Sequence, residues 1–185
     1  MKTTKRLSES SRHMRVTPSQ SSLRSVHSMK HTFVRIDIDP APLYAPAVIA
    51  LCAEQQEELE RRYPGEDEAP RGLDPQISFL VARIDDEPIG CVGLQPMEQH
   101  MAEVRRMYVR PAQRGFGVSR ALLAAVEEMA LGWGVLTLRL ETGDLQPESI
   151  SLYQSSGYRR IPAFGVYVGQ PRSLCFEKHL HLQLV

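Results

Sequence analysis

A glycine-containing turn between a strand-like segment and a helix-like segment most constrains what this chain can fold into. The sequence VRPAQRGFGVSRALL, residues 109–123, follows the strand-like residues 103–109 and leads into an amphipathic helical pattern. The first N–H groups of a helix lack internal partners and lie at the positive end of the helix dipole, and glycines ahead of them let the main chain approach a phosphate closely. Arg110, Arg114 and Arg120 add positive charge. The pattern predicts a backbone cradle for a diphosphate group; the alternative is a tight turn that binds nothing.

Neither of two common nucleotide-binding motifs is complete in this turn. A P-loop needs Gly-x-x-x-x-Gly-Lys-Ser/Thr, and the dinucleotide fingerprint needs a third glycine where this chain has Arg120. The residues from Arg114 to Ser119 instead resemble the signature Gln/Arg-x-x-Gly-x-Gly/Ala of the GNAT superfamily of N-acetyltransferases, with Ser119 in place of the last small residue. The resemblance covers residues 33–180, because AEVRRMYVRPAQRGFGVSRALL, LRLETG and PESISLYQSSGYRRI follow one another in the order that the family shows.

The spacing of apolar residues predicts strands interleaved with three helices. We expect strands at residues 32–38, 77–84, 88–96, 103–109, 135–141, 158–161, 166–168 and 173–180, and helices at residues 43–63, 116–132 and 147–156. Pro40 is expected to end the first strand. Strict alternation along residues 103–109 would place Glu103 and Val109 on one face of the sheet and Val104 and Tyr108 on the other.

These elements and the resemblance together indicate an α/β fold. We expect a GNAT-like three-layer sandwich, in which helices cover both faces of a mixed central β-sheet. The resemblance further implies a V-shaped splay between the two central parallel strands, which would be the strands that begin near Glu103 and Val135.

The first 28 residues differ in composition from the rest of the chain. Residues 1–30 contain seven Lys or Arg and one Glu, so the remainder carries a net charge of about −6. We predict a disordered, basic, Ser-rich extension at residues 1–28 and a single N-acetyltransferase domain at residues 29–185. We favour an extension without a function; an organelle-targeting peptide, a nucleic-acid-binding arm and a natural start at Met29 are the alternatives.

The composition also excludes several classes of function. The acidic balance of residues 29–185 argues against a nucleic-acid partner, and the chain has no apolar run of the roughly 20 residues that span a membrane. The three cysteines and six histidines do not show metal-ligand spacing, so we expect no metal. We expect a cytoplasmic protein with reduced thiols, and a homodimer is compatible with the family.

The resemblance implies that acetyl-CoA is the cosubstrate and indicates which residues hold it. Backbone N–H groups of the glycine turn would bind the diphosphate, and the main chain of residues 107–109 would pair with the pantetheine arm and polarise the thioester carbonyl. The predicted coenzyme-binding residues are Met107, Tyr108, Val109, Arg114, Gly115, Phe116, Gly117, Val118, Ser119, Arg120, Gln146 and Ser149.

Two residues are candidates for proton transfer. Glu103, in a strand position that resembles that of the base in some GNAT enzymes, would take the proton of the amine; Glu141 is the reserve. Tyr153, which the resemblance places beside the coenzyme sulfur, would protonate the leaving thiolate. Structural roles are the alternatives: Glu103 pairing with an arginine, and Tyr153 packing in the core.

The acceptor is expected to be the primary amine of a small or amino-acid-like molecule. Arg62, Tyr63 and Glu141 are the predicted acceptor-binding residues, and the Gly-punctuated residues 164–171 are expected to lie over the acceptor pocket. A protein N-terminus or lysine as acceptor, and a non-catalytic acyl-CoA-binding module, are the alternatives.

Overall fold

The computed structural model describes residues 35–65, 73–98 and 100–181, so the extension predicted at residues 1–28 lies outside the described residues. Along the chain the elements are β1 (Asp37–Ala41), α1 (Pro46–Arg62), β2 (Ser78–Ile84), β3 (Glu87–Pro96), β4 (Met101–Val109), the 3-10 helix η1 (Pro111–Gln113), α2 (Val118–Gly132), β5 (Thr137–Gly143), α3 (Pro147–Ser155), β6 (Arg159–Arg160), the 3-10 helix η2 (Gly165–Tyr167) and β7 (Ser173–His179). Pro46 and Pro147 open α1 and α3, where a missing N–H costs no intrahelical hydrogen bond.

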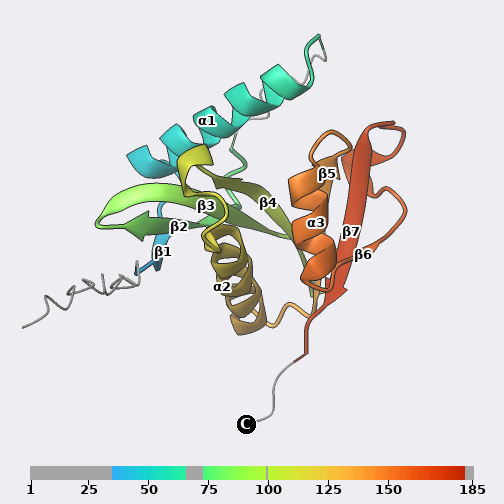
Figure 1. The fold of residues 1–185 in the computed structure, drawn as a ribbon. Helices are drawn as coiled ribbons and strands as arrows, with labels where there is room; N and C mark the ends of the chain where they lie inside the picture. Colours follow the sequence, from blue (N-terminus) through green and yellow to red (C-terminus); the bar gives the residue numbers. More distant parts are fainter. Residues whose placement is uncertain (1–34, 66–72, 99, 182–185) are drawn as a thin grey trace, which may run out of the picture. The chain divides into compact units, whose positions relative to one another are not determined.

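The described strands form one mixed sheet in the order β1-β2-β3-β4-β5-β7-β6. Every neighbouring pair is antiparallel except β4 and β5, which run parallel. The connection from β4 to β5 passes through α2, as a parallel pair requires. Figure 1 shows α1 on one side of the sheet and α2 on the other, which confirms the predicted sandwich.

The two parallel strands separate after a short paired stretch. Met101 to Val104 pair with Thr137 to Leu140, although β4 continues to Val109. Beyond the pairs the strands diverge, and this is the predicted V-shaped splay.

A β-bulge in β4 changes which side chains face which layer. Cys91 of β3 lies opposite Tyr108 of β4, but Gly93 lies opposite Arg105, so β4 carries one extra residue between them. Arg106, at the bulge, has a φ of 53°. Val104 and Val109 consequently pack in the same core cluster, whereas Tyr108 packs in the cluster on the opposite face. The expectation of strict alternation was therefore wrong beyond Arg105, because a bulge reverses the facing of the residues that follow it.

Two apolar clusters hold the layers together. The larger one joins the sheet to the faces of α2 and α3, and α2 contributes the predicted stripe: Val118, Leu122, Leu123, Val126 and Ala130 are buried. The smaller one packs α1 on the other face of the sheet, through Val48, Leu51 and Cys52 against Phe79 and Val81. The sheet is thus covered on both sides, as its apolar central strands require.

Local turn chemistry explains where the element boundaries agree and differ. Asp85 and Asp86 both have positive φ angles, as the two-residue hairpin turn between β2 and β3 requires. Pro40 does not end β1, because an edge strand tolerates a proline whose missing N–H faces away from the sheet. The strand expected at residues 166–168 is wrong: Gly165 has a φ of 52°, and the Tyr167 N–H donates to the carbonyl of Phe164 in η2.

Two glycine-to-alanine substitutions test this packing in opposite directions. A Cβ on Gly90 would lie 2.7 Å from the carbonyl oxygen of Tyr108, whereas a Cβ on Gly132 would meet nothing within 4 Å. We expect Gly90→Ala to lower the free energy of unfolding by about 1–3 kcal/mol. Gly132→Ala should raise it by about 0.5–1 kcal/mol, because alanine loses less backbone entropy in a helix. Urea unfolding followed by circular dichroism measures both, and equal stabilities would contradict the close strand approach.

Candidate active site

The glycine turn lies between η1 and the first residue of α2. Gly115 and Gly117 have φ angles of 84° and 83°, and Gly117 is the N-cap of α2 in the left-handed conformation. A Cβ added to either glycine would meet nothing within 4 Å. Neither glycine is needed for close packing against protein, so these glycines serve the turn conformation and keep the approach to the N-terminus of α2 open.

Two adjoining cavities follow from the divergence of β4 and β5. One, of about 200 Å³, lies between α1, the end of β4, the glycine turn and α3. The other, of about 600 Å³, lies between the diverging strands and the segment before β7. We call them the cradle cavity and the cleft cavity. The residues that line both are Gln55, Leu59, Met107, Gln146 and Ser149.

Nine of the twelve predicted coenzyme-binding residues line the cradle cavity. They are Met107, Tyr108, Val109, Arg114, Gly115, Val118, Ser119, Gln146 and Ser149. The other three do not. Phe116 is 73% exposed, Gly117 forms the helix cap, and the guanidinium of Arg120 donates to the Ser155 hydroxyl at 3.0 Å.

The end of β4 offers main-chain groups to the cradle cavity in place of a neighbouring strand. The side chain of Gln55, on α1, donates to the carbonyl of Met107 at 2.9 Å. The Arg114 Nε donates to the carbonyl of Val109 at 2.8 Å. Gln55 was missed in the sequence, because a glutamine in the polar run of a helix gives no sign that it reaches a strand.

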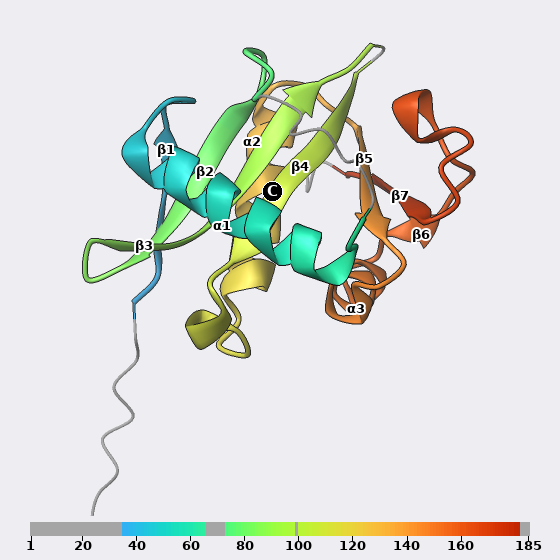
Figure 2. The same ribbon diagram turned by 90° about the horizontal axis from the view of Figure 1, so that it is seen from above.

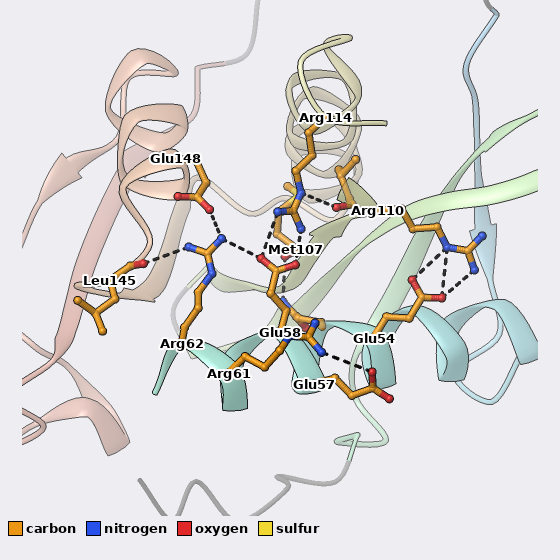
Figure 3. Close-up of polar contacts among 12 residues, drawn as sticks. Glu54, Glu57, Glu58, Arg61, Arg62, Met107, Arg110, Arg114, Leu145 and Glu148 are labelled. Atoms are coloured by element: carbon orange, nitrogen blue, oxygen red, sulfur yellow. Dashed lines mark hydrogen bonds and ion pairs between the residues drawn. The ribbon is translucent and has the colours of Figure 1, made fainter. Parts of the chain in front are cut away.

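An ion-pair network crosses the cradle cavity (Figure 3). Glu58 accepts from Arg114 at 2.5 and 3.1 Å and from Arg62 at 2.9 Å, and Arg62 also pairs with Glu148 of α3. Hydrogen bonds from Arg114 and the nearby positive charges lower the pKa of Glu58, and the bond from Arg62 lowers the pKa of Glu148. The network ties α1 to the glycine turn and to α3.

Arg62 and Tyr63 hold the turn between β5 and α3 rather than the cleft cavity. Arg62 donates to the carbonyl of Leu145 at 3.0 Å, and the Tyr63 hydroxyl accepts from the Leu145 N–H at 2.9 Å. Arg62 lines the cradle cavity, whereas Tyr63 lines neither cavity. The structure therefore does not bring these two predicted acceptor residues to the place where Glu103 lies.

The cleft cavity brings together the three residues predicted for chemistry, Glu103, Glu141 and Tyr153. Glu103 is buried and accepts a hydrogen bond of 2.6 Å from the hydroxyl of Tyr167. Burial and the neighbouring Glu103 raise the pKa of Tyr167, so its phenol stays protonated and donates at neutral pH. Tyr167 was missed as a site residue; its only signal was its place in the Gly-punctuated loop, which does lie beside this cavity.

Tyr153 is held rigidly in the wall of the cleft cavity. Its ring packs edge-on against the ring of Tyr158, with the ring centroids 5.8 Å apart. It also packs at a tilt against Phe176, with the centroids 6.3 Å apart. Only 5% of the residue is exposed, and this burial raises the pKa of the phenol. A buried tyrosine whose proton is retained at neutral pH can act as a proton donor.

Within the described part of the chain, no group of three or more His, Cys, Asp or Glu side chains is arranged to hold a metal ion. Among the same residues, none of the helices is long and apolar enough to cross a membrane.

Comparisons with known proteins agree with this geometry. The model of the acetyltransferase (GNAT) family matches residues 45–158. An IAA acetyltransferase of Azospirillum brasilense is 37% identical over 139 residues, which cover 72% of this chain and 91% of that protein. A Klebsiella pneumoniae structure assigned as an acyl-CoA N-acyltransferase has 32% identity and a TM-score of 0.70, covering 79% of this chain and 98% of the other. A GNAT acetyltransferase of Elizabethkingia anophelis, solved with acetyl-CoA bound, shares the fold with a TM-score of 0.60 at 20% identity, covering 78% of this chain and 98% of the other.

The ion-pair network predicts a specific dependence of stability on pH. Because the pKa of Glu58 is lower in the folded chain than its ordinary value of 4.5, its contribution to stability is present above that value and is lost as the pH falls. At pH 7, the free energy of unfolding of Glu58→Gln should be about 1–2 kcal/mol lower than that of the wild type. The difference should shrink towards pH 3.

The neighbouring variant Glu57→Gln is the matched control, because Glu57 is 69% exposed and only approaches Arg61 at 4.0 Å. It should unfold as the wild type does at every pH. Urea titrations at several pH values test both variants, and a constant gap for Glu58→Gln would refute the assigned ion pairs.

Proposed function

Since the chain belongs to the acetyltransferase (GNAT) family, we propose that it transfers the acetyl group of acetyl-CoA to the primary amine of a small molecule. The observation that carries this proposal is the divergence of β4 and β5, which joins the cradle cavity to the cleft cavity with its buried carboxylate and phenol. The relative named as an IAA acetyltransferase supports a small-molecule acceptor. The neighbour with acetyl-CoA bound supports the cosubstrate.

The residues of the cradle cavity fit a coenzyme A thioester. The open glycine turn offers the unpaired N–H groups at the start of α2 to a diphosphate, and Arg114 adds a positive charge at the cavity wall. The carbonyls of Met107 and Val109 accept hydrogen bonds from the side chains of Gln55 and Arg114, and the amides of a pantetheine arm can replace those donors. Backbone N–H groups near Tyr108 and Val109 would polarise the thioester carbonyl. Acetyl-CoA supplies an activated acyl group.

Glu103 is the proposed general base. An amine with a pKa near 10 is almost wholly protonated at neutral pH and cannot attack a thioester until it loses a proton. The carboxylate of Glu103 lines the cleft cavity and is oriented by the Tyr167 hydroxyl, so it can take that proton directly or through a water molecule. Glu141, on β5, is the second carboxylate of the cavity and the alternative base.

Tyr153 is the proposed general acid. As the new carbon–nitrogen bond forms and the carbon–sulfur bond breaks, the sulfur leaves with the electron pair, and the Tyr153 phenol supplies the proton that it needs. Burial raises the pKa of Tyr153, so the phenol carries its proton at neutral pH.

Turnover by a Tyr153→Phe variant tests the assignment directly. The wild type should release coenzyme A thiol from acetyl-CoA with members of an amine panel. Tyr153→Phe should lower kcat by about 10²- to 10⁴-fold, the range of general acid–base catalysis, and should bind the coenzyme as the wild type does in calorimetry. Tyr158→Phe is the matched control, because that ring packs against Tyr153 but does not line either cavity.

The outcomes separate the competing functions. If calorimetry detects no heat of binding for any CoA thioester, the proposal is overturned. Binding of coenzyme without turnover of any amine would favour a non-catalytic acyl-CoA-binding module, and unchanged turnover by Tyr153→Phe would remove Tyr153 as the acid.

Removal of the Tyr167 hydroxyl tests how the base is held. Tyr167→Phe deletes the hydroxyl that donates to Glu103 at 2.6 Å. We expect kcat to fall by about 10-fold, the value of one charge-assisted hydrogen bond, while the KM for acetyl-CoA stays unchanged. Glu103→Gln should reduce kcat further. Steady-state kinetics measure kcat for both variants. A lower kcat for Tyr167→Phe than for Glu103→Gln would contradict the assignment of Glu103 as the base and Tyr167 as its positioning residue.

A further inference from the structure

The charges around the cleft cavity do not suit a simple monocationic amine. Arg105, Arg106 and Arg172 line the cavity together with Glu103 and Glu141, so groups of both charges face it; Arg172 is also paired with Asp144 at 3.4 Å. A ligand with a single positive charge gains from the two carboxylates but is repelled by the arginines. A ligand that carries an anionic group beside its amine satisfies both sets of charges.

Arg105 is the arginine that the structure fixes most firmly in this wall. Its Nη1 donates to the side-chain oxygen of Gln95 at 2.7 Å, and the Gln95 amide in turn donates to Asp74 at 2.8 Å. The Arg105 side chain is only 21% exposed. This relay from outside the cavity holds the guanidinium in place, so little entropy is lost when it binds a ligand.

The relay uses one of the five N–H donors of Arg105. The Nε lies 3.8 Å from Glu103 Oε1, which is too far for a hydrogen bond, and the same oxygen accepts from the Tyr167 hydroxyl. Within the described part of the chain, the donors of Arg105 other than Nη1 have no hydrogen bond at standard length. A guanidinium with donors to spare in a concave, partly buried wall suits a carboxylate, which it binds through two parallel hydrogen bonds.

The pairing of Glu103 with Arg105 matches the charges of an amino acid. Both residues lie on β4 ahead of the bulge, two positions apart, so their side chains leave the same face of the sheet. A carboxylate and a guanidinium a few ångströms apart complement an amine and a carboxylate attached to one carbon atom. On the basis of the proposed function, we infer that the acceptor is an α-amino acid or a close analogue, whose carboxylate binds Arg105 while its amine faces Glu103.

On this inference the acceptor carboxylate binds Arg105 and not Arg62, the arginine that was predicted among the acceptor-binding residues. Arg62 donates to Glu58, Glu148 and Leu145 around the cradle cavity, whereas Arg105 and Glu103 share the cleft cavity. The alternative is that Arg105 only balances the charge of Glu103 and contacts no substrate.

Matched acceptors distinguish the two roles of Arg105. The experiment measures kcat/KM for a set of L-α-amino acids and for the corresponding α-carboxamides, which keep the side chain and the amine but lack the negative charge. The wild type should prefer the free acids by about 10- to 100-fold, the value of a charge-assisted pair. Arg105→Gln should abolish most of this preference through KM, and Arg105→Lys should retain part of it.

The decisive quantity is the ratio of kcat/KM for the free acid to kcat/KM for the carboxamide, measured within each variant. The amine of a carboxamide is less basic than that of the free acid, so each kcat/KM is referred to the concentration of the neutral amine. A change in the efficiency of Glu103 then affects both acceptors of a pair alike, and a merely charge-balancing Arg105 would leave the ratio unchanged. Gln95→Leu, which removes the anchor but keeps the guanidinium, should reduce the preference by a smaller factor. Arg35→Gln, at an exposed pair with Asp37 on β1, is the control and should keep the wild-type ratio.

Three results would overturn the inference in distinguishable ways. If the wild type uses amides and simple amines as well as free acids, the acceptor class is wrong while the acetyltransferase proposal stands. If the wild type prefers acids but Arg105→Gln does so equally, the carboxylate binds elsewhere. If no acid, amide or simple amine releases thiol although calorimetry shows coenzyme binding, the proposed function fails and the inference fails with it.

Discussion

The departure of β5 from β4 after four paired residues is the constraint on which the rest of the structure depends. Parallel strands that stayed paired would satisfy each other's main-chain groups and leave no space between them. Here the end of β4 is open, and Gln55 and Arg114 occupy its carbonyls at Met107 and Val109. The bulge at Arg106 completes the arrangement, because it lets Glu103 and Arg105 face one layer while Val109 returns to the core of the other. The cradle cavity and the cleft cavity are two consequences of the same separation.

The sequence allowed the frame of the site to be predicted because that frame depends on local rules. Glycines with positive φ, a proline at a first helical turn and a stripe of apolar residues act within a few positions of themselves, so Gly117, Pro147 and Leu122 could be interpreted without a structure. The resemblance to a family then supplied the mixed sheet with helices on both faces and the splay between its parallel strands.

The contacts that complete the site could not be predicted in the same way. Tyr167 reaches Glu103 across 64 positions, and Gln55 reaches Met107 across 52, so neither pair leaves a periodic trace. The position of the bulge at Arg106 could not be read from β4 itself, because no glycine marks it there: an arginine adopts the positive φ that the register requires. Arg62 and Tyr63 were expected beside the acceptor, yet both turn towards Leu145 instead. Long-range polar contacts of this kind depend on how layers stack, which a single sequence does not encode locally.

The position of α1 has a consequence for how the two parts of the sheet are held together. Figure 2 shows α1 crossing over β2, β3 and β4, with its last turn near β5 and α3. At one end of the V the halves share a main-chain ladder, and at the other the side chains of Glu58, Arg62 and Glu148 tie α1 to α3. Since attraction between partly exposed charges weakens as ionic strength rises, salt weakens this tie and leaves the main-chain ladder unaffected. Added salt is therefore expected to cost α1 part of its attachment to α3, while the strands keep their pairing.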